Sequence, residues 1–346
     1  MTSSETLPAT MKVGLYFRNT DVRVEERPVP EIGSREALAD VKACGICGSD
    51  IMSWYREPAT RNGGINTGHE IAGRLIAVGS GLSSWKAGDR VIITHHFPCL
   101  ECTPCLDGNE TACEAMHKKH IDPGGFSQFV RILETGVTRG LYRLPDRMSY
   151  EEGSFVEPLG CVVRSMRKAM PIAGRSVLVM GSGLAGLLHI KSALALGARS
   201  IAAVDTNEHR LRAAEQSGAT QLFHANEALP TADRVFICTG SAAASIKALE
   251  CVSRGGHILF FAAAGPDKEL SIPVTRFWFS QPTIQFSYGA APRDMEEATE
   301  WIASGKVRVD NLVTHRFGIE QTPQAFALAA NPRDDSLKII VQPNGS

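Results

Sequence analysis

The pattern of hydrophobic and polar residues changes near residue 155. Before that point, short β-like runs alternate with Gly, Pro and Asn residues, which is typical of an all-β, loop-rich domain. These runs cover Lys12–Phe17, Ala37–Ala43, Ile71–Val78, Arg90–Thr94 and Phe126–Leu133. We therefore expect the N-terminal part of the chain to form a β-rich domain.

From about Gly174 the pattern becomes strand, glycine turn, helix and strand. The predicted strands are Ser176–Met180, Ser200–Val204, Arg234–Cys238 and His257–Ala262. The helices predicted between and after them are Leu184–Leu196, Asn207–Ser217, Ala242–Val252 and Met295–Ala303, with a late strand at Leu337–Val341. Such β-α-β repetition predicts an α/β domain with a parallel sheet covered on both faces.

Composition adds limits to this picture. The chain has 346 residues, enough for two domains, with 43% hydrophobic and 21% charged residues. Its net charge of −1 gives no electrostatic reason to expect nucleic acid or an anionic membrane as a partner. No apolar run reaches about 18 residues, and Met1–Thr10 lacks the features of a signal peptide. We therefore expect a cytoplasmic protein with no membrane partner.

Four of the nine cysteines lie close together, in the pattern C-x2-C-x2-C-x7-C. They are Cys99, Cys102, Cys105 and Cys113. Two-residue gaps let a loop bring neighbouring thiolates to one zinc ion, and four thiolates leave no position open for substrate. The spacing therefore predicts a structural zinc. Scattered core cysteines and an iron–sulfur cluster are the alternatives, which metal analysis would distinguish.

Three further segments carry possible ligands for a second metal. They are Cys44–Asp50 with the sequence CGICGSD, Gly68–Glu70 with the sequence GHE, and Glu157–Leu159 with the sequence EPL. A catalytic zinc needs about three protein ligands and one free position. Each segment alone is weak evidence, because a His-Glu pair is common in polar turns and buried cysteines are common in cores.

A glycine-rich sequence, GSGLAG, follows the first predicted strand of the α/β domain and begins a helix. Its residues are Gly181, Ser182, Gly183, Leu184, Ala185 and Gly186. In a dinucleotide-binding turn the first glycine permits the tight turn and the second lets the pyrophosphate approach the backbone. The third allows the helix to pack closely on the strand. The helix N-terminus would then hold the diphosphate.

Asp205 ends the second predicted strand of this domain, 19 residues after Gly186. A carboxylate there accepts hydrogen bonds from the ribose hydroxyls and repels a 2′-phosphate, so we expect NAD rather than NADP. Arg210 is a candidate for the adenine pocket, although an exposed helix arginine is the simpler interpretation. Thr239, within Cys238-Thr239-Gly240, resembles the turn under the nicotinamide ribose.

Taken together, these motifs resemble the zinc-dependent medium-chain dehydrogenase/reductase family, in its sorbitol, threonine and aminocyclitol dehydrogenase branch. The likeness extends from about Met11 to Gln342. It implies a β-rich, GroES-like catalytic domain made of residues 11–157 and 294–346. It also implies a Rossmann domain with a doubly wound parallel sheet, residues 158–293, that binds NAD.

The resemblance also assigns roles to the second group of ligands. It implies that Cys47 is the thiolate ligand, with Cys44 only a neighbour, and that His69 supplies the imidazole. Glu70 would be a direct or exchangeable carboxylate ligand. Glu157 would bind zinc directly or through water.

Around these ligands, the resemblance implies that Ser49 takes the substrate proton and that Asp50 orients the ligand histidine. Lys338 is a candidate partner of Asp50. One position departs from the family pattern, because Met52 stands where many relatives have a histidine that carries the proton onward, and methionine cannot do so. The proton then travels through Ser49, the cofactor ribose and water, or another group replaces the histidine.

Other residues are candidates for the pocket. His95 and His96 are interpreted as structural or pocket-lining, and Trp54 and Tyr55 as pocket residues. The resemblance implies a homodimer or homotetramer, and a sheet-edge strand around Gln281–Tyr288 is a candidate for pairing between subunits.

The sequence thus predicts an enzyme with two zinc ions that transfers a hydride between a secondary alcohol, of polyol, sugar or cyclitol type, and NAD. An amino-alcohol dehydrogenase of the L-threonine 3-dehydrogenase type is one alternative. A non-catalytic NAD-binding module with one structural zinc is another. Two zinc ions per chain would favour the enzyme, and one would favour the module.

Overall fold

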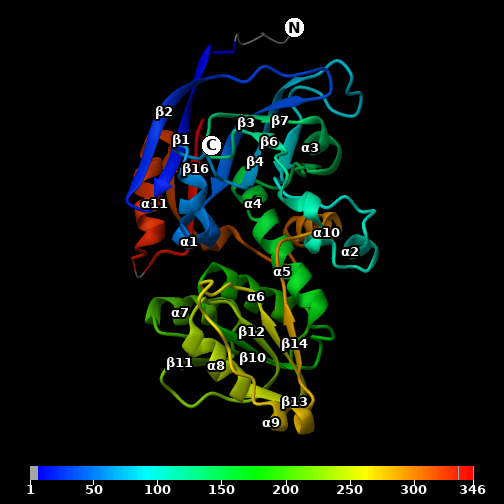
Figure 1. The fold of residues 1–346 in the computed structure, drawn as a ribbon, viewed down its shortest axis with the longest axis vertical. Helices are drawn as coiled ribbons and strands as arrows, with labels where there is room; N and C mark the ends of the chain where they lie inside the picture. Colours follow the sequence, from blue (N-terminus) through cyan, green and yellow to red (C-terminus); the bar gives the residue numbers. More distant parts are fainter. Residues whose placement is uncertain (1–6, 334, 346) are drawn as a thin grey trace. The chain divides into compact units, whose positions relative to one another are not determined.

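A computed structural model describes residues 7–333 and 335–345 of the chain (Figure 1). The chain divides into two compact units. The first unit extends to Glu157 and also includes residues 313–332 and 338 onward, whereas the second comprises residues 158–312 and 333–337. Within the described ranges, no helix combines the length and apolar character needed to cross a membrane.

The first unit is built on strands. They are β1 (Thr10–Arg18), β2 (Asp21–Pro28), β3 (Ala37–Gly45), β4 (Glu70–Val78), β5 (Arg90–Ile93), β6 (Ile121–Asp122), β7 (Phe129–Ile132), β8 (Leu141–Arg143), β15 (Val313–Gly318) and β16 (Lys338–Gln342). The strand order is β15-β16-β3-β4-β5-β8, with β6 and β7 joined to the side of β3, and β1 pairs with β2 as a hairpin. All these pairs are antiparallel except β15–β16.

Short helices connect the strands of the first unit. They are η1 (Gly48–Ile51), α1 (Ser53–Arg56), η2 (Glu57–Thr60), α2 (Thr103–Leu106), η3 (Glu110–Ala112), η4 (Glu114–His117), α3 (Glu134–Arg139), α4 (Tyr150–Ser154), η6 (Ile319–Gln321) and α11 (Thr322–Ala330). The core lies between the sheet and α11, where Tyr16, Phe126 and Phe326 are fully buried and their rings meet. This packing holds β3 and β4, the two strands that lead into the site described below.

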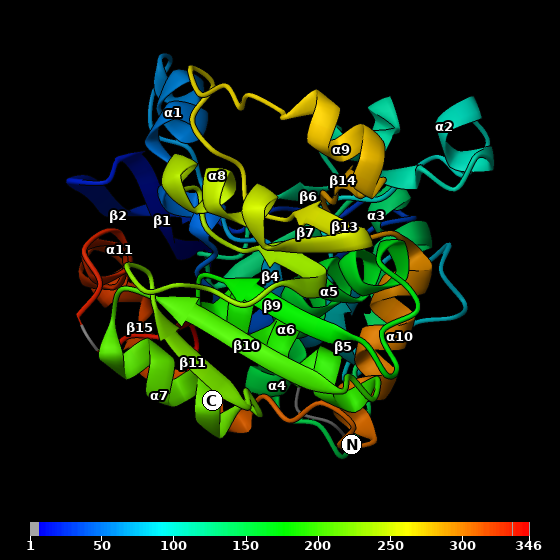
Figure 2. The ribbon, with the colours of Figure 1, turned by 90° about the horizontal axis from the view of Figure 1, so that it is seen from below.

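The second unit alternates strands and helices. Its strands are β9 (Ser176–Met180), β10 (Ser200–Asp205), β11 (Gln221–His224), β12 (Ala232–Ile237), β13 (Val252–Phe260) and β14 (Thr283–Phe286). Its helices are α5 (Val156–Lys168), which begins at the boundary, α6 (Leu184–Ala195), α7 (Glu208–Gln216), α8 (Ala242–Cys251), α9 (Val274–Ser280), α10 (Pro292–Ala303) and η5 (Asp310–Leu312). The parallel sheet has the order β11-β10-β9-β12-β13-β14, and Figure 2 shows β9, β10 and β11 side by side.

This order explains the position of the nucleotide turn. The chain moves outward from β9 to β11, then returns and moves the other way from β12 to β14. Right-handed connections therefore place α6 and α7 on one face and α8 on the other. The change of direction lies between β9 and β12, which is where a doubly wound sheet binds its ligand. The predicted fold, a β-rich GroES-like domain and a Rossmann domain, is confirmed.

The division into units differs from the expected domain limits in two places, since the second unit also contains residues 333–337. We expected the catalytic domain to resume at residue 294, whereas the second unit continues to Leu312 and so includes α10. The buried carboxylate of Asp294, in the first turn of α10, pairs with Arg164 and Arg167 of α5. Met295 packs beside Gly160 of the same helix. These contacts tie α10 to the second unit.

Candidate active site and nucleotide turn

The four clustered cysteines converge in the loop that contains α2, η3 and η4. Their four sulfur atoms all lie within 4.8 Å of one another. The Cys102 and Cys105 sulfurs are 3.5 Å apart, and a tetrahedral ion with bonds of about 2.3 Å needs sulfurs roughly 3.8 Å apart. The loop therefore fits a metal ion with little adjustment.

Backbone amides of the loop donate hydrogen bonds to two of these sulfurs. The amide of Cys102 donates to the Cys99 sulfur and the amide of Cys99 donates to the Cys113 sulfur, both at 3.3 Å. Hydrogen bonds from the amides of Glu101 and Cys102 lower the pKa of Cys99 to about 6. The pKa of Cys102, by contrast, is raised to about 12, and burial raises that of Cys105, so the amides favour the thiolate form at Cys99. The donor set consists of four sulfurs and is closed.

A second group of possible ligands forms where β3 and β4 lie side by side. β3 ends at Gly45, and Cys47 follows it directly before η1. His69 precedes β4, and Glu70 is the first residue of that strand, paired with Gly45. One ligand atom from each of Cys47, His69 and Glu70 lies within 4.8 Å of the other two. Strand register thus brings together two segments that are separated by more than twenty residues of chain.

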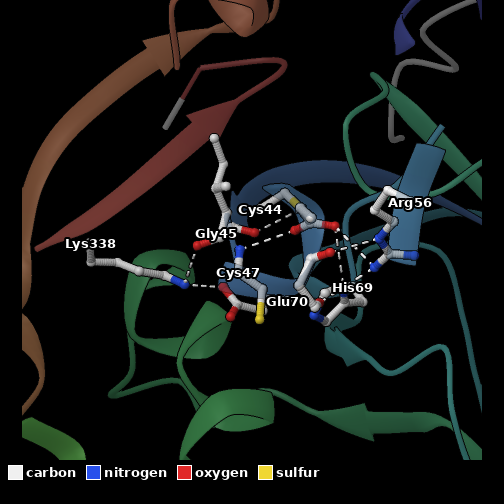
Figure 3. Close-up of polar contacts among 10 residues, drawn as sticks. Cys44, Gly45, Cys47, Arg56, His69, Glu70 and Lys338 are labelled. Carbon is white, nitrogen blue, oxygen red and sulfur yellow. Dashed lines mark hydrogen bonds and ion pairs between the residues drawn. The ribbon is translucent and has the colours of Figure 1, made fainter. Parts of the chain in front are cut away.

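The carboxylate of Glu70 is buried and only half satisfied. Its Oε2 atom is ion-paired with the ammonium of Lys338, and both side chains are almost fully buried (Figure 3). Its Oε1 atom is buried and has no hydrogen-bond partner among the described residues. A buried unpaired carboxylate oxygen is costly. A carboxylate oxygen of Glu70 lies within 4.8 Å of the candidate ligand atoms of Cys47 and His69, so a divalent cation bound by this group would compensate the carboxylate.

Gly45 makes room for the Glu70–Lys338 ion pair. A Cβ atom at residue 45 would overlap both the Glu70 carboxylate and the Lys338 ammonium. Lys338 reaches this point because β16 pairs with β3, with Ile340 opposite Gly45. Glycine is therefore required here by space, and any larger residue would displace the pair.

Asp50 connects the thiolate segment with the histidine. Its side chain is fully buried, its Oδ2 accepts a 3.0 Å hydrogen bond from the Cys47 amide, and its Oδ1 lies 3.6 Å from His69 Nδ1. Burial opposes protonation of His69, but the charges of Asp50 and Cys47 outweigh it and raise the His69 pKa well above its usual range. The negative charges that favour a proton on the His69 imidazole would also favour a metal cation bound to that ring instead of the proton.

Cys44 lies outside this group and has a packing role. Its side chain is fully buried, and burial raises the pKa of its thiol well above the usual range. A Cβ atom at Gly68 or at Gly125 would come within 2.9 Å or 2.6 Å of the Cys44 sulfur. Gly68 also has a φ of 94°, which favours glycine. The glycine of the GHE motif therefore allows the chain to turn over Cys44 and present His69.

The remaining candidates surround these three ligands. The ring of His95 is 4.7 Å from that of His69, and His96 stacks on His95 at 3.5 Å. Burial lowers the pKa of His96 to about 3 and that of His95 well below its usual range, so both rings are neutral at pH 7. Glu157 is not part of the three-ligand group, although its charge contributes to the raised pKa of His69.

The glycine-rich turn lies between β9 and α6, as the sequence predicts. Gly181 has a φ of 96°, and a Cβ atom there would be 3.0 Å from Thr239 Cβ. A Cβ atom at Gly186 would collide with the Gly181 carbonyl oxygen, so that glycine lets the helix lie against the turn. At Gly183, the N-cap of α6, a Cβ atom would meet only open space. This space at a helix N-terminus fits a diphosphate.

Asp205 lies at the end of β10, facing this turn. Its Oδ2 accepts a 2.7 Å hydrogen bond from the Ser182 amide, and its Oδ1 accepts from the amides of Thr206 and Asn207. Each carboxylate oxygen has about two acceptor sites, so Oδ2 of Asp205 keeps one site for a ribose hydroxyl. The half-buried Arg210 follows on α7, whose N-cap is Asn207.

Comparisons with known proteins agree with this geometry. Residues 33–146 match the family model of the alcohol dehydrogenase GroES-like domain, and residues 185–304 match that of the zinc-binding dehydrogenase. The sorbitol dehydrogenase of Bacillus subtilis is 31% identical over 360 aligned positions, which cover 99% of both chains. The chain belongs to the zinc-binding alcohol dehydrogenase family. It is therefore an oxidoreductase that acts on CH–OH groups, and its predicted family is confirmed.

Solved structures of related dehydrogenases have the same fold. The 2R,3R-butanediol dehydrogenase of Bacillus subtilis is 25% identical, with a TM-score of 0.83 over 96% of this chain and 100% of the other. An Escherichia coli CFT073 protein described as a short chain alcohol dehydrogenase, complexed with NADH, is 21% identical. Its TM-score is 0.85, over 97% of this chain and all of that one. At that identity, the likeness supports the fold alone.

Two features of this dehydrogenase site were not predicted correctly from the sequence. Lys338 pairs with Glu70 and not with Asp50, because the register of β16 carries it to the Glu70 side. The cation beside Asp50 is Arg56 of α1, which the sequence reasoning missed. The available signal was Arg56 itself, the first of two arginines in the short segment that follows the CGSD motif. Figure 3 shows Lys338 and Arg56 approaching from opposite sides.

Proposed function

We propose that this dehydrogenase transfers a hydride between NAD and a secondary alcohol of polyol, sugar or cyclitol type, with a catalytic zinc. The observation that carries the proposal is the cluster of Cys47, His69 and Glu70, with one buried oxygen of Glu70 left without a partner. The sorbitol and butanediol dehydrogenases among its relatives support an alcohol with several hydroxyl groups as the substrate.

Two zinc ions per chain are part of the proposal. We assign the structural ion to Cys99, Cys102, Cys105 and Cys113, whose four sulfurs leave no open position. We assign the catalytic ion to Cys47, His69 and Glu70, with Glu157 as a carboxylate that enters directly or through water. Lys338 balances the charge of Glu70 and would keep its Oε2 away from the metal, which leaves Oε1 as the ligand atom.

The bound zinc would act as a Lewis acid that lowers the pKa of an alcohol. The chain's own residues hold the reacting groups around it. The Ser49 hydroxyl, two residues after Cys47, is proposed to accept the alcohol proton at its Oγ atom while it passes its own hydroxyl proton on to the cofactor ribose and water. Asp50 fixes the tautomer and orientation of His69 from behind, through the 3.6 Å contact with Nδ1.

NAD is proposed as the cofactor because of Asp205. Three backbone amides fix this buried carboxylate at the end of β10, where it would repel a 2′-phosphate. Replacing Asp205 with Ser should reduce the preference for NAD over NADP by about 10-fold to 100-fold in kcat/KM, on the order of 1–3 kcal/mol. An unchanged preference in this variant would contradict the assignment of Asp205.

A substrate screen tests the proposed function as a whole. Purified protein is given NAD and parallel sets of polyols, cyclitols, amino alcohols and simple alcohols, and NADH absorbance is followed. The proposal predicts turnover of at least one polyol or cyclitol, which is lost when the catalytic zinc is removed. Preference for amino alcohols would instead support the threonine-type alternative, and no turnover with any set would contradict the proposal.

We also propose a homodimer, in the cytoplasm. Edge strand β14 has one free side, and aromatic residues on and near it are exposed, including Phe286 at 68% and Trp278 at 73%. Exposed apolar side chains beside a sheet edge suit pairing with a second copy. F286E should shift sedimentation toward the monomer, whereas I246E, on exposed α8, should not. All nine cysteines lie in the described residues and none forms a disulfide, which suits a reducing compartment.

A further inference from the structure

Arg56 makes three hydrogen bonds to the segment that follows Cys47. Its Nε atom donates to the Ser49 carbonyl oxygen at 2.9 Å, and its Nη2 atom donates to the Ser49 hydroxyl oxygen and to Asp50 Oδ1, both at 3.4 Å. The Arg56 side chain is 17% exposed, and the Asp50 side chain is fully buried. One guanidinium therefore contacts both the proposed proton acceptor and the carboxylate that faces His69.

The chemistry of a guanidinium decides what this contact can do. Arginine only donates hydrogen bonds and does not lose its proton in proteins, so it cannot carry the substrate proton onward. Its hydrogen bond occupies one of the two acceptor sites of the Ser49 oxygen. The hydroxyl hydrogen of Ser49 must then point away from Arg56, and one acceptor site remains for the proton of an alcohol.

The same guanidinium compensates the charge of Asp50. This carboxylate has three polar or charged neighbours. The Cys47 amide lies at Oδ2, and the side chains of Arg56 and His69 lie at Oδ1. A buried carboxylate needs such partners to offset the cost of burying its charge and to hold it in one orientation. Because Lys338 is committed to Glu70 at the other side of the site, Arg56 is the cation that serves Asp50.

We propose that Arg56 is a positioning residue for the reaction, which orients the Ser49 hydroxyl and holds Asp50 against His69. This inference rests on the proposed function of the site. It also accounts for the departure at Met52. That side chain can neither donate nor accept the proton, so the direction of the Ser49 hydroxyl is set by Arg56 and not by a histidine at residue 52.

The test compares R56Q, R56K and the control R61Q. Arg61 is exposed and lies in the same segment, just after η2. We expect R56Q to lower kcat by about 100-fold with a change in KM of less than about fivefold. R56K keeps the charge but loses the planar fork of hydrogen-bond donors, and we expect its kcat to fall by about 10-fold. R61Q should match the wild type in both parameters.

A second readout does not depend on turnover. When cobalt replaces the catalytic zinc, its visible spectrum reports the geometry of the ligand set. We expect the spectrum to change in R56Q and to stay the same in R61Q, because only the former releases Asp50 from its position against His69. Added guanidinium ion at low concentration should restore part of the kcat of R56A.

Three outcomes would overturn the proposal. The first is a kcat for R56Q within about threefold of R61Q. The second is an unchanged cobalt spectrum in R56Q. The third is a loss of kcat that is accompanied by a marked loss of thermal stability and that guanidinium ion does not rescue. A wild-type protein that oxidises no alcohol would contradict the proposed function instead, and the cobalt spectrum would then still decide the role of Arg56.

Discussion

The four-cysteine loop draws its ligands from residues 99–113, whereas Cys47, His69 and Glu70 come from segments that meet only when β3 pairs with β4. The loop supplies four identical sulfurs, and backbone amides are the main partners that support them. The strand site supplies three different candidate ligands and two cations that balance nearby carboxylates, the buried Lys338 and the half-buried Arg56. A closed site of one ligand type suits structure, and an open, mixed and charge-balanced site suits catalysis.

The largest expected effect is a loss of activity in a variant that changes the strand site and leaves the four-cysteine loop intact. C47S should lower kcat/KM by about 10³-fold or more, because the site loses its only thiolate. The fold and the metal of the four-cysteine loop should remain, since no ligand of that loop is changed. Steady-state kinetics measure the loss of kcat/KM. Circular dichroism and zinc content are the controls for the fold and for the loop metal. Near-normal activity of C47S would remove Cys47 from the catalytic site.

The second prediction concerns the buried ion pair of the strand site. K338M leaves the Glu70 carboxylate buried without its cation, so we expect a loss of about 3–5 kcal/mol in the free energy of unfolding. The matched control is K12M, which breaks the exposed pair between Lys12 and Glu320 and should cost less than about 1 kcal/mol. Denaturant unfolding measures both variants. Equal losses would show that burial does not distinguish the two pairs.

The smallest expected effect belongs to the loop. C102S should release the loop metal and lower stability by about 2 kcal/mol, because the loop is held at both ends by the rest of the first unit. The catalytic cobalt spectrum should stay unchanged in this variant. Thermal unfolding and metal content are the measurements. A spectrum that changes as much as in C47S would mean that the two sites are one coupled structure.

The same contrast explains what the sequence could predict. The loop site follows from spacing, because its ligands are near neighbours in the chain and the pattern itself sets the geometry. The glycine turn is also local, and Gly181 and Gly186 meet the backbone constraints that the motif implies. The alternation of strands and helices after residue 174 likewise follows from the hydrophobic pattern.

The strand site depends on register, which the sequence does not state. Only the family resemblance connected Cys47 with His69, and neither pattern nor resemblance gave Lys338 its partner. That partner is set by β16 lying beside β3, nearly 300 residues away in the chain. Arg56 was missed for a different reason, since it lies only seven residues from Ser49 in the chain but contacts it because α1 folds back over Ser49. Long-range strand pairing and this local fold-back were thus the parts that needed the structure.

The assignment of two different metal sites is tested most directly by anomalous X-ray scattering at the zinc edge on crystals of the wild-type protein. We predict two zinc peaks per chain. One peak should lie among the sulfurs of the four-cysteine loop, and the other should lie at bonding distance from the Cys47 sulfur and the His69 ring. A single peak in the loop, with none between Cys47 and His69, would contradict the catalytic assignment.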